Sequence, residues 1–500
     1  MSTCSLLHRF RLPIAVLTAG VTLAACSGSS GTGASPGSSS ASTGAGAMSS
    51  APMSTSFGAS AGASTGAGGG GSAGAVVPMA ASGQAPDATV TVCQFAGPEY
   101  DAIQHFGTQF TAMTGGKIKI KMVSIPINQN LPVTINQIRT SSTCDLVDAG
   151  AQQAADLNPY LVPLSTFMND STLFNATAYH LDDFPKAVQT VSSDAKSGLM
   201  SLTYGSDVQM LYYRKDLMAQ WGITVPSPPA AWTWEQFEAA LQTVQTKIKA
   251  ANMQMSPIAI SGTQDAGSAM FATTAMWGYG GSPFNGNDPN FTDSKAVAGL
   301  SHWDGLLNTL KVANPGSPTY AYNELLTALQ QGKTAMAVEW NAAASTLADP
   351  KLSPISAGKL GYALLPYAQG LPATTARIFP TTHSLGISAK SQNQKAAFEF
   401  AAWYTSPEIA KAMVSSGMGS SGRFSVLTDP TIVAKQPVLA AVGASVQLYH
   451  ALPAVTSFGD LLLNVMAPQI NAMFTGQKSA TQAAADMQSG AQNLIQKAGK

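Results

Sequence analysis

Charged residues are scarce in this chain. Lysine plus arginine and aspartate plus glutamate each number 26 among 500 residues, so only 10% of the chain is charged and the formal net charge is zero. A typical soluble domain is about 25% charged. A nucleic-acid-binding protein usually carries a concentrated basic surface, which this composition does not suggest. We therefore expect no nucleic acid or other polyanion as a partner.

Cysteine is also rare, with four residues in the chain. Cys4 and Cys26 lie near the N-terminus, which leaves Cys93 and Cys144 for the folded part, without the histidine spacing of a zinc site. Export would permit a disulfide between them. If Cys93 closes one strand and Cys144 opens a parallel neighbour, however, their Cα atoms could exceed the ~7 Å limit for bridging. The sequence therefore leaves two alternatives for Cys93 and Cys144, a disulfide or two buried thiols.

Sequence motifs of catalysis are missing. The chain has no GxSxG and no HExxH, its six histidines have no ligand spacing, and its glycine runs do not end in GK[ST]. We expect neither a metal nor a cofactor. Glu99 and Asp207 could imitate the paired acids of a glycosidase, but a sugar-binding cleft uses such pairs as well. A carbohydrate-active enzyme is therefore the less favoured alternative.

A membrane-spanning run is absent from the N-terminus. The apolar stretch 12–25 has about 14 residues, whereas a spanning helix needs roughly 20. Basic residues precede this stretch, and Leu23-Ala24-Ala25-Cys26 ends it, which resembles a bacterial lipobox. We expect residues 1–26 to be a lipoprotein signal peptide, with Cys26 acylated (palmitate) at the extracytoplasmic face of the cell membrane. The alternative is a plain secretory signal with an incidental cysteine.

Residues 27–86 are rich in serine, glycine and alanine. Such a segment buries too little apolar surface to fold, so we expect a disordered tether. Beyond it, strand-like and helix-like patterns alternate, which predicts βαβ units and a parallel sheet. The predicted elements are a strand at 88–95, a helix at 100–113, a strand at 117–123, a helix through 135–138 and a strand at 145–148. Parallel sheets bind ligands beyond the carboxyl ends of their strands.

Several sequence blocks, in a fixed order, resemble one family. The blocks are CDLVDAG (144–150), GLMSLTYGSDVQMLYYRKDLMAQWGI (198–223), Trp234-Glu235, FATTAMWGYGG (271–281), QGKTAMAVEW (331–340), GYALLP (361–366), LGISAKS (385–391), KAAFEF (395–400) and SPE (406–408). Together they resemble the bacterial extracellular solute-binding proteins of family 1, the maltose-binding-protein-like lipoproteins of ABC sugar importers. The resemblance covers about 88–500.

This resemblance implies an α/β fold of the two-lobed periplasmic-binding-protein type (type II). Each lobe would be a mostly parallel sheet flanked by helices, with a ligand cleft between the lobes. Lobe 1 would hold about 87–205 and 386–430, and lobe 2 about 206–385 and 431–500. Hinge closure on a sugar, oligosaccharide or polyol would present a monomeric protein to the permease. An alternative from another functional class is a membrane-anchored carbohydrate sensor or adhesin, which would lack a closing cleft.

The ligand-binding candidates are acids, aromatic residues and hydrogen-bonding side chains. Asp207 comes first, because the family block places a ligand-facing acid there; its alternative is a capping or hinge carboxylate. Trp340 ends a strand-like run and could instead be a core residue. Arg423 could bind the ligand or pair with an acid. Candidates at predicted strand ends and loops are Phe95, Glu99, Tyr100, Asp148 and His383. Candidates on a predicted helix that enters a Gly-Gly turn are Ser268, Phe271 and Trp277.

Overall fold

The computed structural model describes residues 85–125 and 130–498. The expected signal peptide, the lipid-anchor cysteine Cys26 and the tether up to residue 84 lie outside the described residues. Within the described ranges, none of the helices combines the length and apolar character needed to cross a membrane.

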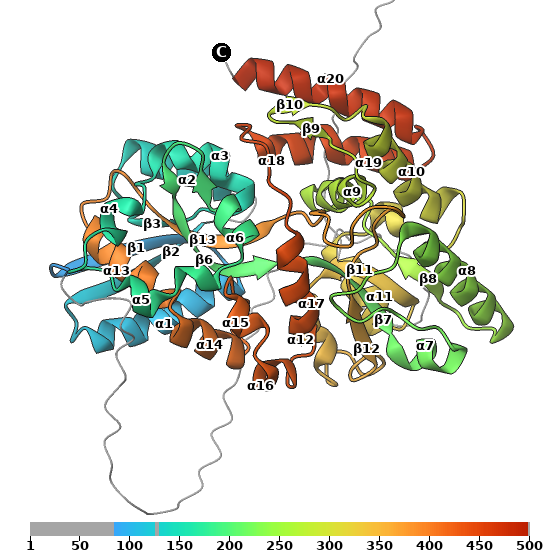
Figure 1. Cartoon of the computed structure of the whole chain (residues 1–500), viewed down its shortest axis with the longest axis horizontal. Helices are drawn as coiled ribbons and strands as arrows, with labels where there is room; N and C mark the ends of the chain where they lie inside the picture. The colour runs from blue at the N-terminus through green and yellow to red at the C-terminus, as the bar shows by residue number, and fades with distance from the viewer. Residues whose placement is uncertain (1–84, 126–129, 499–500) are drawn as a thin grey trace, which may run out of the picture. The chain divides into compact units, whose positions relative to one another are not determined.

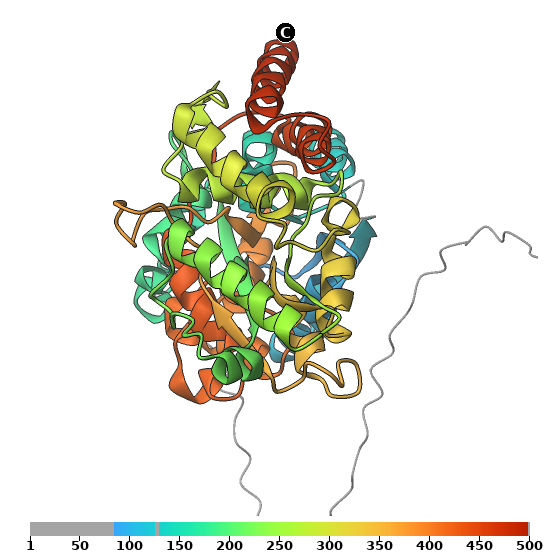
Figure 2. The same ribbon diagram turned by 90° about the vertical axis from the view of Figure 1, so that its right-hand side faces the viewer.

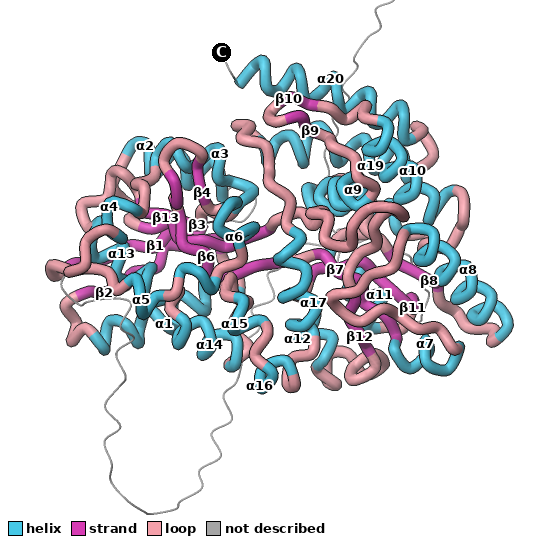
Figure 3. The backbone as a smooth tube through the Cα atoms, viewed as in Figure 1, coloured by secondary structure: helices cyan, strands magenta, loops and turns pink. Residues whose placement is uncertain are grey.

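The first sheet contains the strand that the sequence pattern predicts at 88–95. This strand, β1 (Ala88–Phe95), buries Val90 and Val92 and pairs in parallel with β2 (Ile118–Ile125) and β3 (Leu146–Asp148). Two antiparallel strands, β13 (Thr381–Ile387) and β6 (Ser201–Asp207), complete the order β2-β1-β3-β13-β6. Figure 3 shows these strands together in magenta.

The second sheet begins almost where the first ends, because only Val208 separates β6 from β7 (Gln209–Arg214). β7 lies between β12 (Leu360–Ala363) and β11 (Thr334–Trp340), antiparallel to both. β8 (Ser256–Ala259) pairs in parallel with β11, which gives the order β12-β7-β11-β8. The chain thus passes directly from one sheet into the other at Val208.

Helices surround both sheets (Figure 1). Those before β7 or after β13, up to residue 433, are α1 (Pro98–Met113), α2 (Asn130–Thr140), α3 (Ala154–Leu157), α4 (Ser165–Met168), α5 (Ala176–Tyr179), α6 (Lys186–Val191), α13 (Gln394–Tyr404), α14 (Pro407–Ser415), α15 (Phe424–Leu427) and α16 (Pro430–Val433). Those between β7 and β13 are α7 (Lys215–Trp221), α8 (Trp234–Ala250), α9 (Ala266–Gly278), α10 (Ser294–Asn308), α11 (Tyr322–Gln330) and α12 (Ala343–Ala348). Two short hairpins, β4 (Ser193–Asp194) with β5 (Gly198–Leu199) and β9 (Phe284–Asn285) with β10 (Asp288–Pro289), lie in the loops.

The C-terminal helices return to the second sheet. They are α17 (Val438–Ser445), α18 (Phe458–Asp460), α19 (Ala467–Phe474) and α20 (Ala480–Ala498). α17 packs against β7 and β12, and α19 packs against α20, as Figure 2 shows at its upper edge. The chain therefore passes between the two sheets at three places: after β6, before β13 and between α16 and α17.

The α/β class and the two-lobed architecture are confirmed, and each sheet is mostly parallel with a single reversed strand. The reversed strands are β13 in the first sheet and β7 in the second, and both adjoin a crossing. The first sheet also takes in β13 from Thr381, five residues before the boundary at 386 that the resemblance implies.

Cys93 and Cys144 form a disulfide, with Cα atoms 5.7 Å apart. The sequence left this question open, because strands at different heights would separate the two thiols. Cys144 instead lies just before β3, in a turn held against β1. There the Asp145 amide donates to the Thr91 carbonyl, and the Asp145 carboxylate accepts from the Thr91 amide. This turn brings Cys144 next to Cys93, and both cysteines are fully buried.

Candidate functional site

Four polar side chains meet where the first sheet ends near the crossings. Glu99 comes from the first turn of α1, Asp148 from the last residue of β3, and Asp207 from the last residue of β6. His383 lies on β13, opposite Gly205 of β6. Oxygen or nitrogen atoms of Glu99, Asp207 and His383 lie within 4.8 Å of one another. We call these four residues the polar cluster.

His383 lies between two carboxylates. Its Nε2 donates to Asp207 Oδ2 at 3.2 Å, and its Nδ1 lies 3.6 Å from Asp148 Oδ2. The second distance is too long for a hydrogen bond, so it describes an ion pair. Burial alone would lower the pKa of His383, but the neighbouring carboxylates of Asp148 and Asp207 outweigh it and raise that pKa well above its usual value. The site therefore favours the imidazolium form.

Glu99 follows a sharp turn out of β1. Gly97 has a φ of 154°, a conformation that a side chain would strain, and the turn starts α1 so that Glu99 falls in its first turn. Burial raises the pKa of Glu99. The charge of His383 opposes this shift, whereas the charges of Asp207 and Asp148 add to it.

Asp207 is held from both sheets. Its Oδ1 accepts from Asn341 Nδ2 at 3.2 Å, and Asn341 follows directly on β11 of the second sheet. The amide of Val208 donates to the Asn341 side chain at 2.6 Å, and the Tyr449 hydroxyl donates to the Asp207 carbonyl at 2.9 Å. Asp207 can therefore serve as a hinge carboxylate and bind a ligand at the same time. Its Oδ1 is bonded across the crossing, and its Oδ2 faces His383.

Aromatic rings with accessible surface lie around the polar cluster. Phe95 is half-buried, with its ring 5.9 Å from that of His383. Trp340 is also half-buried and packs at 5.3 Å on the buried ring of Phe271, so the core alternative for Trp340 does not describe its position fully. Tyr100 is half-buried beside Glu99.

Tyr322 is an aromatic residue that the sequence reasoning missed. It starts α11 and is 36% exposed. Burial raises its pKa, and the charges of Glu339, Asp207 and Glu99 add to the shift, which places the hydroxyl within their electrostatic reach. Tyr322 and Asn341 both belong to the second sheet's part of the chain, and neither lies in a motif that marks a site.

Two candidates on α9 are engaged inside the fold. Trp277 is buried and stacks on His450 at 4.2 Å and on Phe379 at 5.9 Å. Ser268 is buried, and its hydroxyl bonds to Ser261 and to Asp265, the N-cap of α9. These contacts stabilise the start of α9 and its packing.

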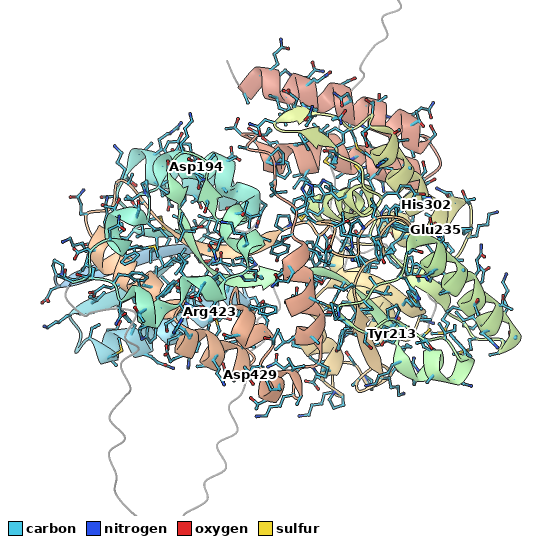
Figure 4. The ribbon with its side chains drawn as sticks, viewed as in Figure 1. Asp194, Tyr213, Glu235, His302, Arg423 and Asp429 are labelled. Atoms are coloured by element: carbon cyan, nitrogen blue, oxygen red, sulfur yellow. A yellow bond between two sulfur atoms is a disulfide. The ribbon has the colours of Figure 1, made fainter. Side chains whose placement is uncertain are left out.

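Arg423, labelled in Figure 4, is buried at the start of α15. Its guanidinium donates to the carbonyls of Thr405, His180 and Tyr179 and to Asp183, and it covers the rings of Tyr179 and Phe184. Of the two alternatives for Arg423, the structure shows pairing with an acid, Asp183, together with hydrogen bonds to three backbone carbonyls. We leave Arg423, Trp277 and Ser268 out of the site proposed below.

A cavity of about 700 Å³ lies elsewhere, beside α3 and α6. The segment 451–454 closes one side, and polar lining comes from Asn158, Lys186, Gln189 and Asp194, the last labelled in Figure 4. None of the candidates from the sequence lines this cavity.

One buried acid lies near the candidate aromatics without being a candidate itself. Glu339 is fully buried on β11, where its Oε1 accepts from the Trp340 amide at 2.7 Å. Its Oε2 has no hydrogen-bond partner among the described residues. Burial raises the pKa of Glu339 well above its usual value, with a further contribution from the charge of Asp265 and opposition from the Trp340 amide.

Two α/β sheets joined by crossing strands, with polar and aromatic side chains gathered at a crossing, define a two-lobed binding protein. The sequence model of the bacterial extracellular solute-binding proteins matches residues 96–411, and the chain belongs to this family. It is therefore a solute-binding protein.

Relatives agree on this class but differ in the solute they are named for. A protein of Sinorhizobium fredii, described as a probable amino-acid ABC transporter periplasmic-binding protein, is 24% identical over 85% of this chain and 93% of its own length. A mannitol-binding protein of Pseudomonas aeruginosa is 28% identical over 53% of this chain and 57% of its own. The crystal structure of a solute-binding protein from Agrobacterium radiobacter in complex with ribitol has a TM-score of 0.68 at 21% identity, over 82% of this chain and 99% of that one.

Proposed function

We propose that this protein captures a polyol or a small sugar for an ABC importer. The observation that carries the proposal is the polar cluster of Glu99, Asp148, Asp207 and His383 with half-exposed rings beside it. Carboxylates and an imidazole form strong, charge-assisted hydrogen bonds with hydroxyl groups. Aromatic rings such as Trp340 and Tyr322 offer apolar faces to the C–H groups of the same solute. The mannitol and ribitol named for two relatives fit this chemistry.

An amino acid, the solute in another relative's description, fits the site less well. Its α-carboxylate calls for a cationic partner, and arginine is the usual one. Arg214 pairs with Asp216, Arg377 is buried under backbone carbonyls, and Arg423 is enclosed in its own network. Carboxylates outnumber the imidazole in the polar cluster, so the cluster repels an anionic group.

The transport role adds three further parts to the proposal. The lobes divide at the crossings, which lie at Val208, before Thr381 and between α16 and α17, and they close over the solute by hinge bending. Cys26 carries the lipid anchor on the extracytoplasmic face, and residues 27–86 serve as the tether. A monomer in this closed form delivers its solute unchanged to the permease subunits, which makes it a binding protein and not an enzyme.

A thermal-shift screen of the full chain tests the solute class. The panel contains mannitol, ribitol, maltose, and neutral and basic amino acids, each at millimolar concentration. At 100 times its Kd, a bound solute stabilises the native state by about 2.7 kcal/mol. The proposal expects a raised unfolding midpoint with a polyol or sugar. A response confined to amino acids would overturn it.

A further inference from the structure

The polar cluster has the composition of a transition-metal site as well as that of a hydroxyl-binding site. It joins one imidazole and two carboxylates whose candidate ligand atoms lie within 4.8 Å of one another. Imidazole and carboxylate are the ligands that Zn²⁺ takes in proteins alongside thiolate. From this arrangement we infer that Glu99, Asp207 and His383 bind a divalent transition-metal ion, with Zn²⁺ as the fitting example.

Distances within the cluster agree with a shared ion. Ligands at about 2.0–2.2 Å in tetrahedral geometry are about 3.3–3.5 Å apart. His383 Nε2 and Asp207 Oδ2 lie 3.2 Å apart, close to that separation. Glu99 sits in the first turn of α1 with its ligand atom within 4.8 Å of those of Asp207 and His383, so ion binding requires its carboxylate to move closer.

The surroundings of the proposed ligands also fit a metal centre. A metal-binding histidine usually directs its other ring nitrogen at a carboxylate, which fixes the ring. His383, only 8% exposed, has Asp148 Oδ2 3.6 Å from Nδ1, and neither atom has a hydrogen-bond partner in the described structure. Asn341 holds Asp207 Oδ1 at 3.2 Å and so leaves Oδ2 free to face Nε2.

Charge gives an independent reason. Three carboxylates (Glu99, Asp148 and Asp207) surround one imidazole, so the cluster is negative even when His383 is protonated. An excess of like charge at a partly buried site is costly unless a cation compensates it. A divalent ion supplies that compensation and takes the place of the proton on Nε2. Three protein ligands leave a fourth position open, and there, on the proposed function, a solute hydroxyl binds the ion.

Zinc titration of the full chain tests the inference. The protein is dialysed against EDTA and then against metal-free buffer, and binding is measured by calorimetry. We expect a site with micromolar or tighter affinity that Glu99→Gln and His383→Gln each weaken at least tenfold. His302→Gln is the matched control, because His302 pairs with Glu238 at 2.5 Å outside the proposed ligand set. Calcium should not bind, because it requires six to eight oxygen ligands.

Folding and solute binding are controlled separately. Glu99→Gln preserves size and should leave the unfolding midpoint of the metal-free protein unchanged, so that its loss of zinc affinity cannot be ascribed to unfolding. Zinc binding that is equally tight in Glu99→Gln and the parent, or zinc binding lost equally in His302→Gln, overturns the inference. Polyol binding in EDTA without any site-dependent zinc binding overturns the metal site and leaves the proposed function standing. Zinc binding that depends on Glu99, in a protein that binds no polyol or sugar, supports the metal site and overturns the proposed function.

Discussion

The Nε2 atom of His383 lies 3.2 Å from Oδ2 of Asp207, across the pair formed by β13 and β6. Both strands lie at a crossing between the two sheets, and the other oxygen of Asp207 is held by Asn341 of the second sheet. A solute that competes for Asp207 therefore acts on a residue bonded to both parts of the chain. On the proposed function, this arrangement couples solute binding to the crossing, where a hinge motion would be absorbed.

Tyr322 is expected to stack on the bound solute. Its ring is more exposed than a core ring, and it lies within electrostatic reach of Asp207 and Glu99. Tyr322→Ala should weaken solute binding several-fold, because an aromatic contact is worth about 1 kcal/mol. Tyr322→Phe keeps the ring and is the matched control. Calorimetry should find Phe close to the parent and Ala weaker; equal affinities in all three would exclude the contact.

The disulfide is expected to contribute strongly to stability. Cys93 and Cys144 close a loop with a sequence separation of 51 residues. The chain-entropy relation gives about 4 kcal/mol for a loop of this length. The double variant Cys93→Ser/Cys144→Ser should lose about 2–4 kcal/mol in urea unfolding, and a reducing agent should destabilise the parent but not the variant. Unchanged stability under full reduction would contradict this expectation.

Glu339 makes stability depend on pH. Its folded-state pKa is raised well above the ordinary value, so its contribution is fully present below the unfolded pKa of about 4.3 and is lost as pH rises toward the folded pKa. Within that window, the parent should lose about 1.4 kcal/mol per pH unit relative to Glu339→Gln. Urea unfolding between pH 5 and pH 8 measures the difference. Exposed Glu408→Gln is the control, and parallel curves for the parent and Glu339→Gln would refute the prediction.

Local pattern was enough to predict the first half of the first sheet. The strand expected at 88–95 is β1, and the helix expected at 100–113 begins two residues earlier because Pro98 suits a first helical turn. The mostly parallel sheets were predicted, but the reversed strands β13 and β7 were not, since strand direction at the crossings depends on contacts between distant segments. The disulfide stayed undecided for a similar reason, because a turn before β3 sets the position of Cys144.

The candidate site was accessible from the sequence only in part. Glu99, Asp148, Asp207 and His383 were named from strand ends and family blocks, and the structure brings all four together. Asn341 was missed because its hydrogen bond to Asp207 is a tertiary contact, and Tyr322 because the influence of Asp207 and Glu99 on its hydroxyl arises only in the fold. No local motif marks either residue. Sequence patterns also cannot distinguish a polar or aromatic residue in a binding site from one in the core. Arg423 and Trp277 were both candidates, but Arg423 bonds to a backbone carbonyl and Trp277 stacks on His450 inside the fold.

Calorimetric titration of the full chain and of Asp207→Asn with the polyol or sugar found in the screen tests the central claim most directly. A charged hydrogen bond is worth about 1.5–3 kcal/mol, so Asp207→Asn should weaken binding at least tenfold, and Trp340→Ala should weaken it as well. Asp429→Asn, which alters an acid paired with Lys411 and labelled in Figure 4, should bind like the parent. All variants should unfold near the parent's midpoint. If Asp207→Asn and Trp340→Ala both bind with the parent's affinity, the solute binds elsewhere and the proposed site is wrong.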